Sequence, residues 1–216
     1  ILTLALLPLL LVTATITVVN TIQAGALYEL EIETFEQNLL ASKRSELKNY
    51  MSLAETSIAH IMASTWLHDL EAQEEVRRIL RGLTYGEDGY FFVYNQQGVN
   101  LVHPVQPELE NTSLYDLKDN KGNFVIQELL AIARQGGGYY RYIWRKPSKD
   151  DVEDKLSYVI QLPRWGWMLG TGLYVDDITR EVAKAREEVT NNIRNTFFTV
   201  LVITAASVVI IIFIGV

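Results

Sequence analysis

The chain has 216 residues, of which 21% are charged and none is cysteine. The absence of cysteine excludes disulfides, zinc sites with thiolate ligands and thiol nucleophiles. Asp and Glu outnumber Lys and Arg by 26 to 19, a net charge of −7, so we expect no nucleic-acid partner.

Both ends of the sequence are apolar and free of charge. The first charged residue is Glu29 and the last is Arg194, and about 20 apolar helical residues are enough to cross a bilayer. We therefore predict transmembrane helices over residues 1–22 and 196–216. A secretory signal is the alternative for the first stretch, because Ala24-Gly25-Ala26 has the small residues of a cleavage site, but the apolar run is longer than a signal requires.

The sequence begins at Ile1 rather than at Met and stops inside the second apolar run. We expect it to be part of a longer protein whose cytoplasmic output region lies elsewhere. The middle segment is too long for the charge of its Lys and Arg residues to determine membrane orientation.

After the first apolar stretch, apolar residues recur every three or four positions from Tyr28 to Ile61. This spacing predicts a long amphipathic helix, placed at residues 23–67, and a shorter helix follows over Glu71–Leu83. One face of the long helix is expected to rest on the domain's own sheet in its distal half and on a second subunit near the membrane.

Five runs then have the composition of strands. Aromatic and β-branched residues fill Tyr90–Tyr94, and a turn signal separates this run from Val99–His103, so the two predict a hairpin. Three further strands are expected at Tyr139–Trp144, Leu156–Leu162 and Trp167–Tyr174. A short helix near residues 124–132 lies between the two groups and ends at a run of glycines.

Helical spacing returns after Asp176-Asp177, which we interpret as a helix cap, and continues into the second apolar stretch. The predicted fold class is α+β. It has a core at residues 70–176 made of a five-stranded antiparallel sheet, together with a long N-terminal helix, an exit helix at residues 177–195 and two flanking transmembrane helices.

Five blocks of this sequence, in this order, resemble the single Cache domains of bacterial receptors, in the subgroup called sCache_2. They are Asp88–Tyr94 (DGYFFVY), Leu101–Pro104 (LVHP), Gly136–Trp144 (GGGYYRYIW), Lys155–Val159 (KLSYV) and Trp165–Asp177 (WGWMLGTGLYVDD). The resemblance implies a PAS-like sheet behind a long helix, a ligand pocket on the sheet, and a sensor domain at residues 23–195 outside the inner membrane of a bacterium, between two membrane spans.

Members of this family serve methyl-accepting chemotaxis proteins or sensor histidine kinases, and their known ligands are often acetate, propionate, pyruvate or lactate. We expect the chain to be the sensor region of a chemotaxis receptor first, and of a histidine kinase as the alternative. A cyclase output is not excluded, and a homodimer is expected.

Six residues are candidates for binding a carboxylate, which needs buried donors and a compensating positive charge. Strand alternation puts Tyr140, Tyr142 and Trp144 on one face, and the family pattern favours that face. The candidates are Tyr90, His103, Tyr142, Trp144, Lys155 and Tyr158.

Four of the six candidates have a plainer interpretation. His103 suits a core edge, Lys155 a solvated strand end, Tyr90 an aromatic core stripe with Phe92 and Tyr94, and Tyr158 a hydroxyl bonded to a backbone carbonyl.

A membrane-anchored enzyme is the first rival class, but the sequence shows no nucleophile motif, and we expect no catalytic residue, metal or cofactor. A structural or partner-binding module with an occluded pocket is the second rival class.

Overall fold

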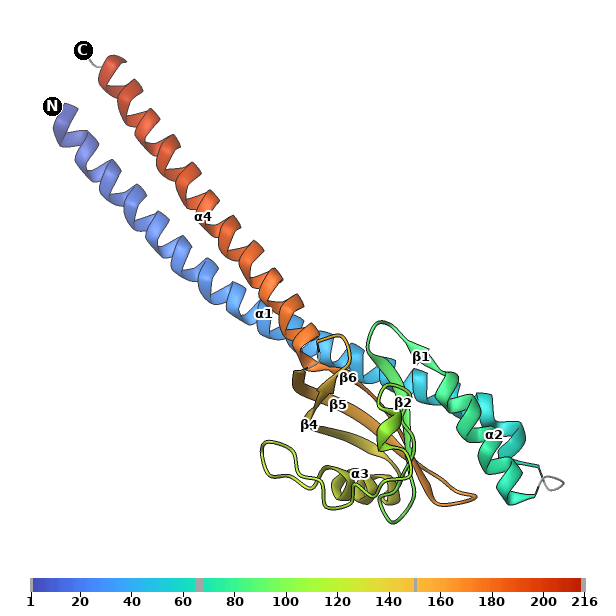
Figure 1. The fold of residues 1–216 in the computed structure, drawn as a ribbon. Helices are drawn as coiled ribbons and strands as arrows, with labels where there is room; N and C mark the ends of the chain where they lie inside the picture. Colours follow the sequence, from blue (N-terminus) through green and yellow to red (C-terminus); the bar gives the residue numbers. More distant parts are fainter. Residues whose placement is uncertain (1, 65–67, 150, 215–216) are drawn as a thin grey trace. The chain divides into compact units, whose positions relative to one another are not determined.

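The computed structural model describes residues 2–64, 68–149 and 151–214, drawn in Figure 1. The chain divides into two compact units. One comprises Leu40–Ile178, and the other comprises Ile1–Leu39 together with Thr179–Val216.

The described helices are α1 (Leu2–Met62), α2 (Asp69–Gly82), the 3₁₀ turn η1 (Pro107–Leu109), α3 (Val125–Arg134) and α4 (Val175–Ile214). The predicted long helix, short helices and exit helix are all present. The long helix ends at Met62, earlier than the predicted end at residue 67, since residues 63 and 64 are not helical. Residues 65–67 of the prediction lie outside the described residues.

The unit Leu40–Ile178 contains one antiparallel sheet, formed by β1 (Thr84–Tyr85), β2 (Gly89–Tyr94), β3 (Asn100–Val102), β4 (Gly138–Lys146), β5 (Asp151–Leu162) and β6 (Trp167–Tyr174). The strand order is β1-β2-β6-β5-β4, and β3 pairs with β2 off this path. The five predicted strands are confirmed. The two-residue β1 adds a sixth strand that the sequence analysis does not predict.

The sheet has a different core on each face because successive strand residues point to opposite sides. On one face, α1 and α2 bury Ile58, Ile61 and Val76 against Phe91 and Leu169. This confirms that the distal part of the long helix rests on the sheet.

On the other face, α3 covers the sheet (Figure 1). Its buried residues, among them Ile126 and Leu129, pack with Tyr90, Phe92 and Tyr142. The odd and even residues of β2 therefore belong to separate cores.

Strand β5 begins at Asp151, five residues before the predicted start at Leu156. The charged residues Asp151, Glu153 and Asp154 pair in register with the end of β4, for example Glu153 with Trp144. They carry little apolar surface because this end of the β4–β5 hairpin is largely solvent-exposed. The prediction that Lys155 lies at a strand end is therefore wrong: it lies inside β5, paired with Tyr142 and Tyr174.

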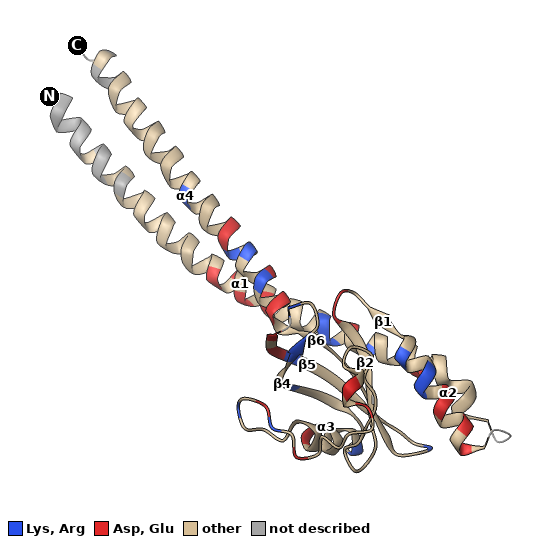
Figure 2. Cartoon of the chain, in the orientation of Figure 1, with Lys and Arg blue, Asp and Glu red and all other residues tan. Residues whose placement is uncertain are grey.

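The second unit consists of the ends of α1 and α4. No charged residue follows Arg194 on α4, which is drawn by charge in Figure 2. An exposed ion pair joins Arg186 to Glu29 at 2.9 Å. Among the residues that the structure describes, one helical stretch, Val175–Ile210, is long and apolar enough to cross a membrane. The first predicted span stays a prediction.

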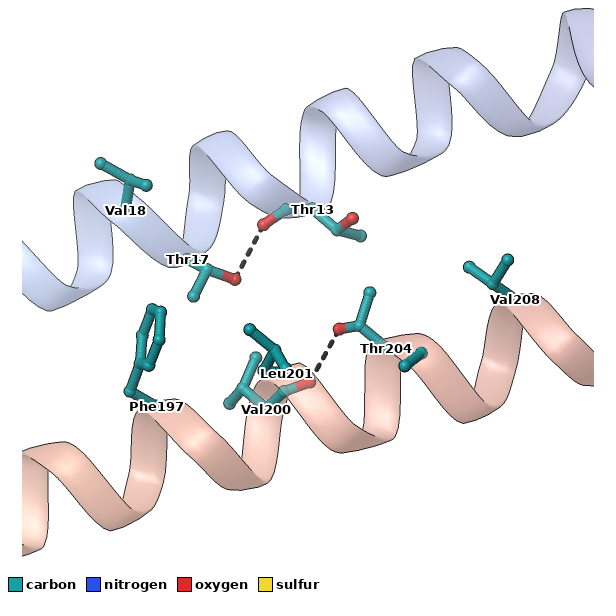
Figure 3. A pocket seen from close by; sticks show the side chains of 9 residues that line it. Thr13, Thr17, Val18, Phe197, Val200, Leu201, Thr204 and Val208 are labelled. Atoms are coloured by element: carbon teal, nitrogen blue, oxygen red, sulfur yellow. Dashed lines mark hydrogen bonds between the residues drawn. The ribbon is translucent and has the colours of Figure 1, made fainter.

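Within this unit a groove of about 580 Å³ lies between the two helices (Figure 3). The hydroxyls of Thr17 and Thr204 are not free to donate into this groove, because each donates at 2.8 Å to the carbonyl four residues earlier in its own helix. Threonine is tolerated in apolar helices in this way. The groove therefore has an almost purely apolar wall.

Candidate ligand-binding site

A small cavity lies between α3 and the sheet. Its volume is about 10 Å³, close to the minimum that holds one water molecule. Five of the six predicted site residues line it, together with four apolar or aromatic residues. The lining is Tyr90, Phe92, Tyr94, His103, Ile126, Leu129, Tyr142, Trp144 and Lys155.

Lys155 supplies the amine of this cavity and is 1% exposed. Its Nζ donates to the hydroxyl of Tyr90 at 2.7 Å and lies 3.9 Å from the centre of the same ring. No ion pair between described residues includes Lys155. Burial holds the pKa of Lys155 well below its usual range, and the more distant Asp88 opposes this only in part.

His103 follows β3 and is also 1% exposed. Its Nδ1 accepts the backbone N–H of Gln106 at 3.1 Å, and its own backbone N–H donates to Glu110 at 2.9 Å. Burial and the neighbouring Lys155 lower the pKa of His103 to about 3. The ring is therefore neutral, and because Nδ1 accepts, Nε2 carries the hydrogen and is a donor.

Tyr142 and Trp144 lie two residues apart on β4, with ring centres 5.8 Å apart. The Tyr142 hydroxyl shares a hydrogen bond of 2.9 Å with Ser157, and burial raises the pKa of Tyr142 above its usual range. The indole N–H of Trp144 is buried and has no hydrogen-bond partner. Unpaired buried donors are rare and costly, so this one indicates a place for an acceptor.

The cavity wall therefore offers donors from an amine, an imidazole, an indole and phenols, and no carboxylate is among its lining residues. Such a wall stabilises an anion, because each donor is desolvated and one of them can carry a positive charge.

Tyr158 does not reach this cavity, and its predicted place there is wrong. The residues of β5 that face the cavity have odd numbers, so Tyr158 points to the opposite side. There its ring packs 4.8 Å from Tyr139 and 5.7 Å from the Nζ of Lys48. The alternation that correctly placed Tyr142 and Trp144 would have excluded Tyr158 as well.

The sequence analysis missed two kinds of residue at the site. Ser157 is fully buried and bonds Tyr142, which its spacing of two from Lys155 would have shown. Gly172 is required by space: a Cβ there would lie 2.8 Å from Cε of Lys155 and 2.8 Å from the Leu156 carbonyl oxygen. No local pattern reveals this, because the contact joins two strands.

The last strand connects the cavity to α4. Tyr174 ends β6, and its ring centre lies 5.3 Å from Nζ of Lys155. Its hydroxyl donates to the carbonyl of Arg145 at 2.5 Å, and α4 begins at the next residue, Val175.

The first turn of α4 is held by Lys146, the last residue of β4. Its Nζ lies 3.1 Å from a carboxylate oxygen of Asp176 and 2.8 Å from one of Asp177. The two aspartates thus stand at the helix N-terminus, as expected for stabilising acidic residues, and they also pair with a buried lysine.

Comparison with known proteins gives consistent results. Residues 39–188 match the family model of the Single Cache domain 2. Over 98% of its length the chain is 41% identical to the sensor histidine kinase MctS of Rhizobium johnstonii, of which it covers 46%. The chain spans between 29% and 46% of the curated relatives it matches.

Solved structures agree. A methyl-accepting chemotaxis protein from Vibrio parahaemolyticus is 37% identical with a TM-score of 0.65, and the match covers 68% of this chain and 99% of that one. A Cache chemosensory domain described for carboxylic acid recognition is 29% identical with a TM-score of 0.59, covering 64% of this chain and 97% of the other. Both the sequence and the fold thus place the chain among sensor domains, and it belongs to the Single Cache domain 2 family.

Proposed function

We propose that this chain is the sensing region of a bacterial inner-membrane receptor and that it binds a short-chain carboxylate such as acetate, propionate, pyruvate or lactate. The observation that carries the proposal is Lys155, a buried amine with a phenol but no anion beside it. The related Cache domain whose title names carboxylic acid recognition supports the same chemistry.

A carboxylate in the cavity would supply what the free site lacks. It would accept from Lys155 and from the unpaired indole of Trp144, and His103 would offer its Nε2 hydrogen without adding charge. The ammonium form of Lys155 then becomes favourable, because an opposite charge within a few ångströms offsets its desolvation.

The cavity volume of about 10 Å³ requires the lining side chains to move when a ligand enters. That movement is the basis we propose for signalling. The ring of Tyr174 contacts Lys155, and Tyr174 is followed in the chain by the first residue of α4. Ligand binding would therefore shift the start of α4 and, through this helix, the predicted second membrane span.

For the output, the relatives include both a histidine kinase and chemotaxis proteins. The kinase is 41% identical over nearly the whole chain, including both terminal helices, and this favours a histidine kinase output over the chemotaxis receptor placed first by the sequence analysis. We propose a homodimer with residues 1–22 and 196–216 in the bilayer and the domain between them in the periplasm. The domain itself is proposed to be non-catalytic.

The test is thermal unfolding of the whole 216-residue chain in lipid nanodiscs with C2–C4 carboxylates. A ligand at 100 times its Kd stabilises the folded state by about 2.7 kcal/mol, so at least one acid should raise the melting temperature by several degrees. Lys155→Met should abolish the response. Tyr158→Phe is the matched control, since Tyr158 lies on the opposite sheet face, and it should respond like the wild type.

If no acid shifts the melting temperature, the carboxylate assignment is wrong. If Lys155→Met still responds fully, the acid binds somewhere else.

A further inference from the structure

We propose that Trp144 sets the length of the ligand by separating the inner cavity from a larger outer pocket that would otherwise accept the tail of a longer carboxylic acid. This inference rests on the proposed function. It concerns which acids fit the site, and it is tested separately from whether any acid binds.

The outer pocket has a volume of about 230 Å³, against about 10 Å³ for the inner cavity. Its wall includes side chains from the η1 to α3 region and from the β4–β5 hairpin. Among the described residues, Trp144 is the one that lines both spaces. Removing its bulk would therefore join them.

The position of Trp144 explains how it acts as a wall. It lies on β4, the edge strand of the sheet, where its neighbours Ile143 and Arg145 line the outer pocket. Its ring is fixed against Tyr142 at 5.8 Å and faces the ring of His103 at 6.1 Å with an interplanar angle of 29°. A ring held by two aromatic neighbours is a firm partition.

The chemistry of the outer pocket suits an alkyl tail. Leu109, Leu114, Val125, Ile143 and Val152 supply apolar surface, and burying a methylene group is favourable on such a surface. The charged donor Lys155 lines the inner cavity only. A longer acid would then place its carboxylate inside and its tail outside, with the plane of Trp144 between them.

Trp144 also has its buried, unpaired N–H, so its loss removes a donor as well as a wall. Two substitutions separate these roles. Trp144→Val removes both and keeps a residue that favours strands, whereas Trp144→Phe removes the donor and keeps an aromatic wall.

The experiment is titration calorimetry on the whole chain in nanodiscs with acetate, propionate, pentanoate and hexanoate. The wild type should prefer the two short acids. In Trp144→Val the ratio of hexanoate to acetate affinity should rise at least tenfold, since a methylene that fits a pocket changes affinity by about that factor. In Trp144→Phe both affinities should fall and the ratio should stay within about threefold, since the wall remains.

The outcomes are distinguishable. If the wild type binds no carboxylate, the proposed function fails and the inference fails with it. If the wild type binds acetate or propionate, the inference alone is overturned by equal binding of hexanoate, by an unchanged ratio in folded Trp144→Val, or by an equal gain in Trp144→Phe. Circular dichroism checks folding, and Trp144→Leu is measured by the same ratio if the valine variant does not fold.

Discussion

Replacing Lys155 by methionine should stabilise the ligand-free domain. The side chain is 1% exposed, and burial depresses its pKa well below the value of an exposed lysine. In the unfolded chain the amine returns to a pKa of about 10.4. Between the lowered pKa of folded Lys155 and the unfolded value, the unfolded state therefore binds more protons than the folded state, and this difference favours unfolding.

The size of the effect follows from proton linkage. Between the depressed folded pKa and the unfolded value, the free energy of unfolding rises with pH by about 1.4 kcal/mol per unit. At pH 7, which is roughly 3.4 units below the pKa of the unfolded state, burial of Lys155 lowers the free energy of unfolding by at most about 5 kcal/mol. The substitution loses the hydrogen bond to Tyr90, worth about 1 kcal/mol. The contact of the amine with the Tyr90 ring adds little here, because cation–π attraction needs the charged amine.

The neighbouring Tyr174 side chain can serve as a partner of the Tyr90 hydroxyl after the substitution. Methionine has a similar length and adds apolar contact. The balance is a gain of about 1–3 kcal/mol at pH 7, shrinking by up to about 1.4 kcal/mol per unit as the pH rises toward 10.

The assay is denaturant unfolding of both proteins in nanodiscs at pH 7, 8, 9 and 10. The reasoning is refuted if Lys155→Met is less stable at pH 7 and the difference between the two proteins does not change with pH. That result would mean that Lys155 is already charged in the folded domain.

Three further predictions follow. Carboxylate binding should be accompanied by uptake of close to one proton, because Lys155 becomes charged. Calorimetry in buffers with different heats of ionisation should therefore give a binding enthalpy that depends on the buffer. A binding enthalpy that does not depend on the buffer would argue against proton uptake by Lys155. Burial lowers the pKa of His103 to about 3, so protonation of this histidine in the unfolded state should destabilise the wild type as the pH falls. Between pH 6.5 and pH 5 the free energy of unfolding of the wild type should fall by about 2 kcal/mol more than that of His103→Gln, as measured by denaturant unfolding at both pH values. Gly170→Ala should destabilise the domain by about 1–3 kcal/mol, since its Cβ would lie 2.2 Å from the ring of Phe92; an unchanged melting temperature would contradict the packing.

Much of the fold was predictable because its elements have strong periodicity. Residues Trp167–Tyr174 form β6 with the predicted bounds. The start of β5 was not predictable from apolar content, since three of the four residues from Asp151 to Asp154 are charged and this segment joins the sheet through pairing with the end of β4. Strand extension by a partner is a tertiary effect that local composition does not carry.

The site was predictable where the alternation of side chains between the two faces of a strand was applied. On β4 this alternation placed Tyr142 and Trp144 together at the cavity. The sequence analysis did not apply the same alternation to β5, where it separates Lys155 from Tyr158. The structure has these two residues on opposite faces of the sheet. The small size of the cavity and the need for Gly172 depend on how three strands approach one another, and no single segment encodes that.

The cost of burying Lys155 is itself informative. A methionine or leucine at this position would fill the same space and stabilise the core, so packing alone gives no reason for an amine there. Protein cores are filled mainly with apolar side chains, and an exception is expected at a position on which function depends. Here the amine of Lys155 lies beside the rings of Tyr90 and Tyr174, and Tyr174 is the residue before α4. An anion that restores its charge would both recover the lost stability and act on the strand that leads into that helix, so the same group accounts for affinity and for the coupling of binding to movement.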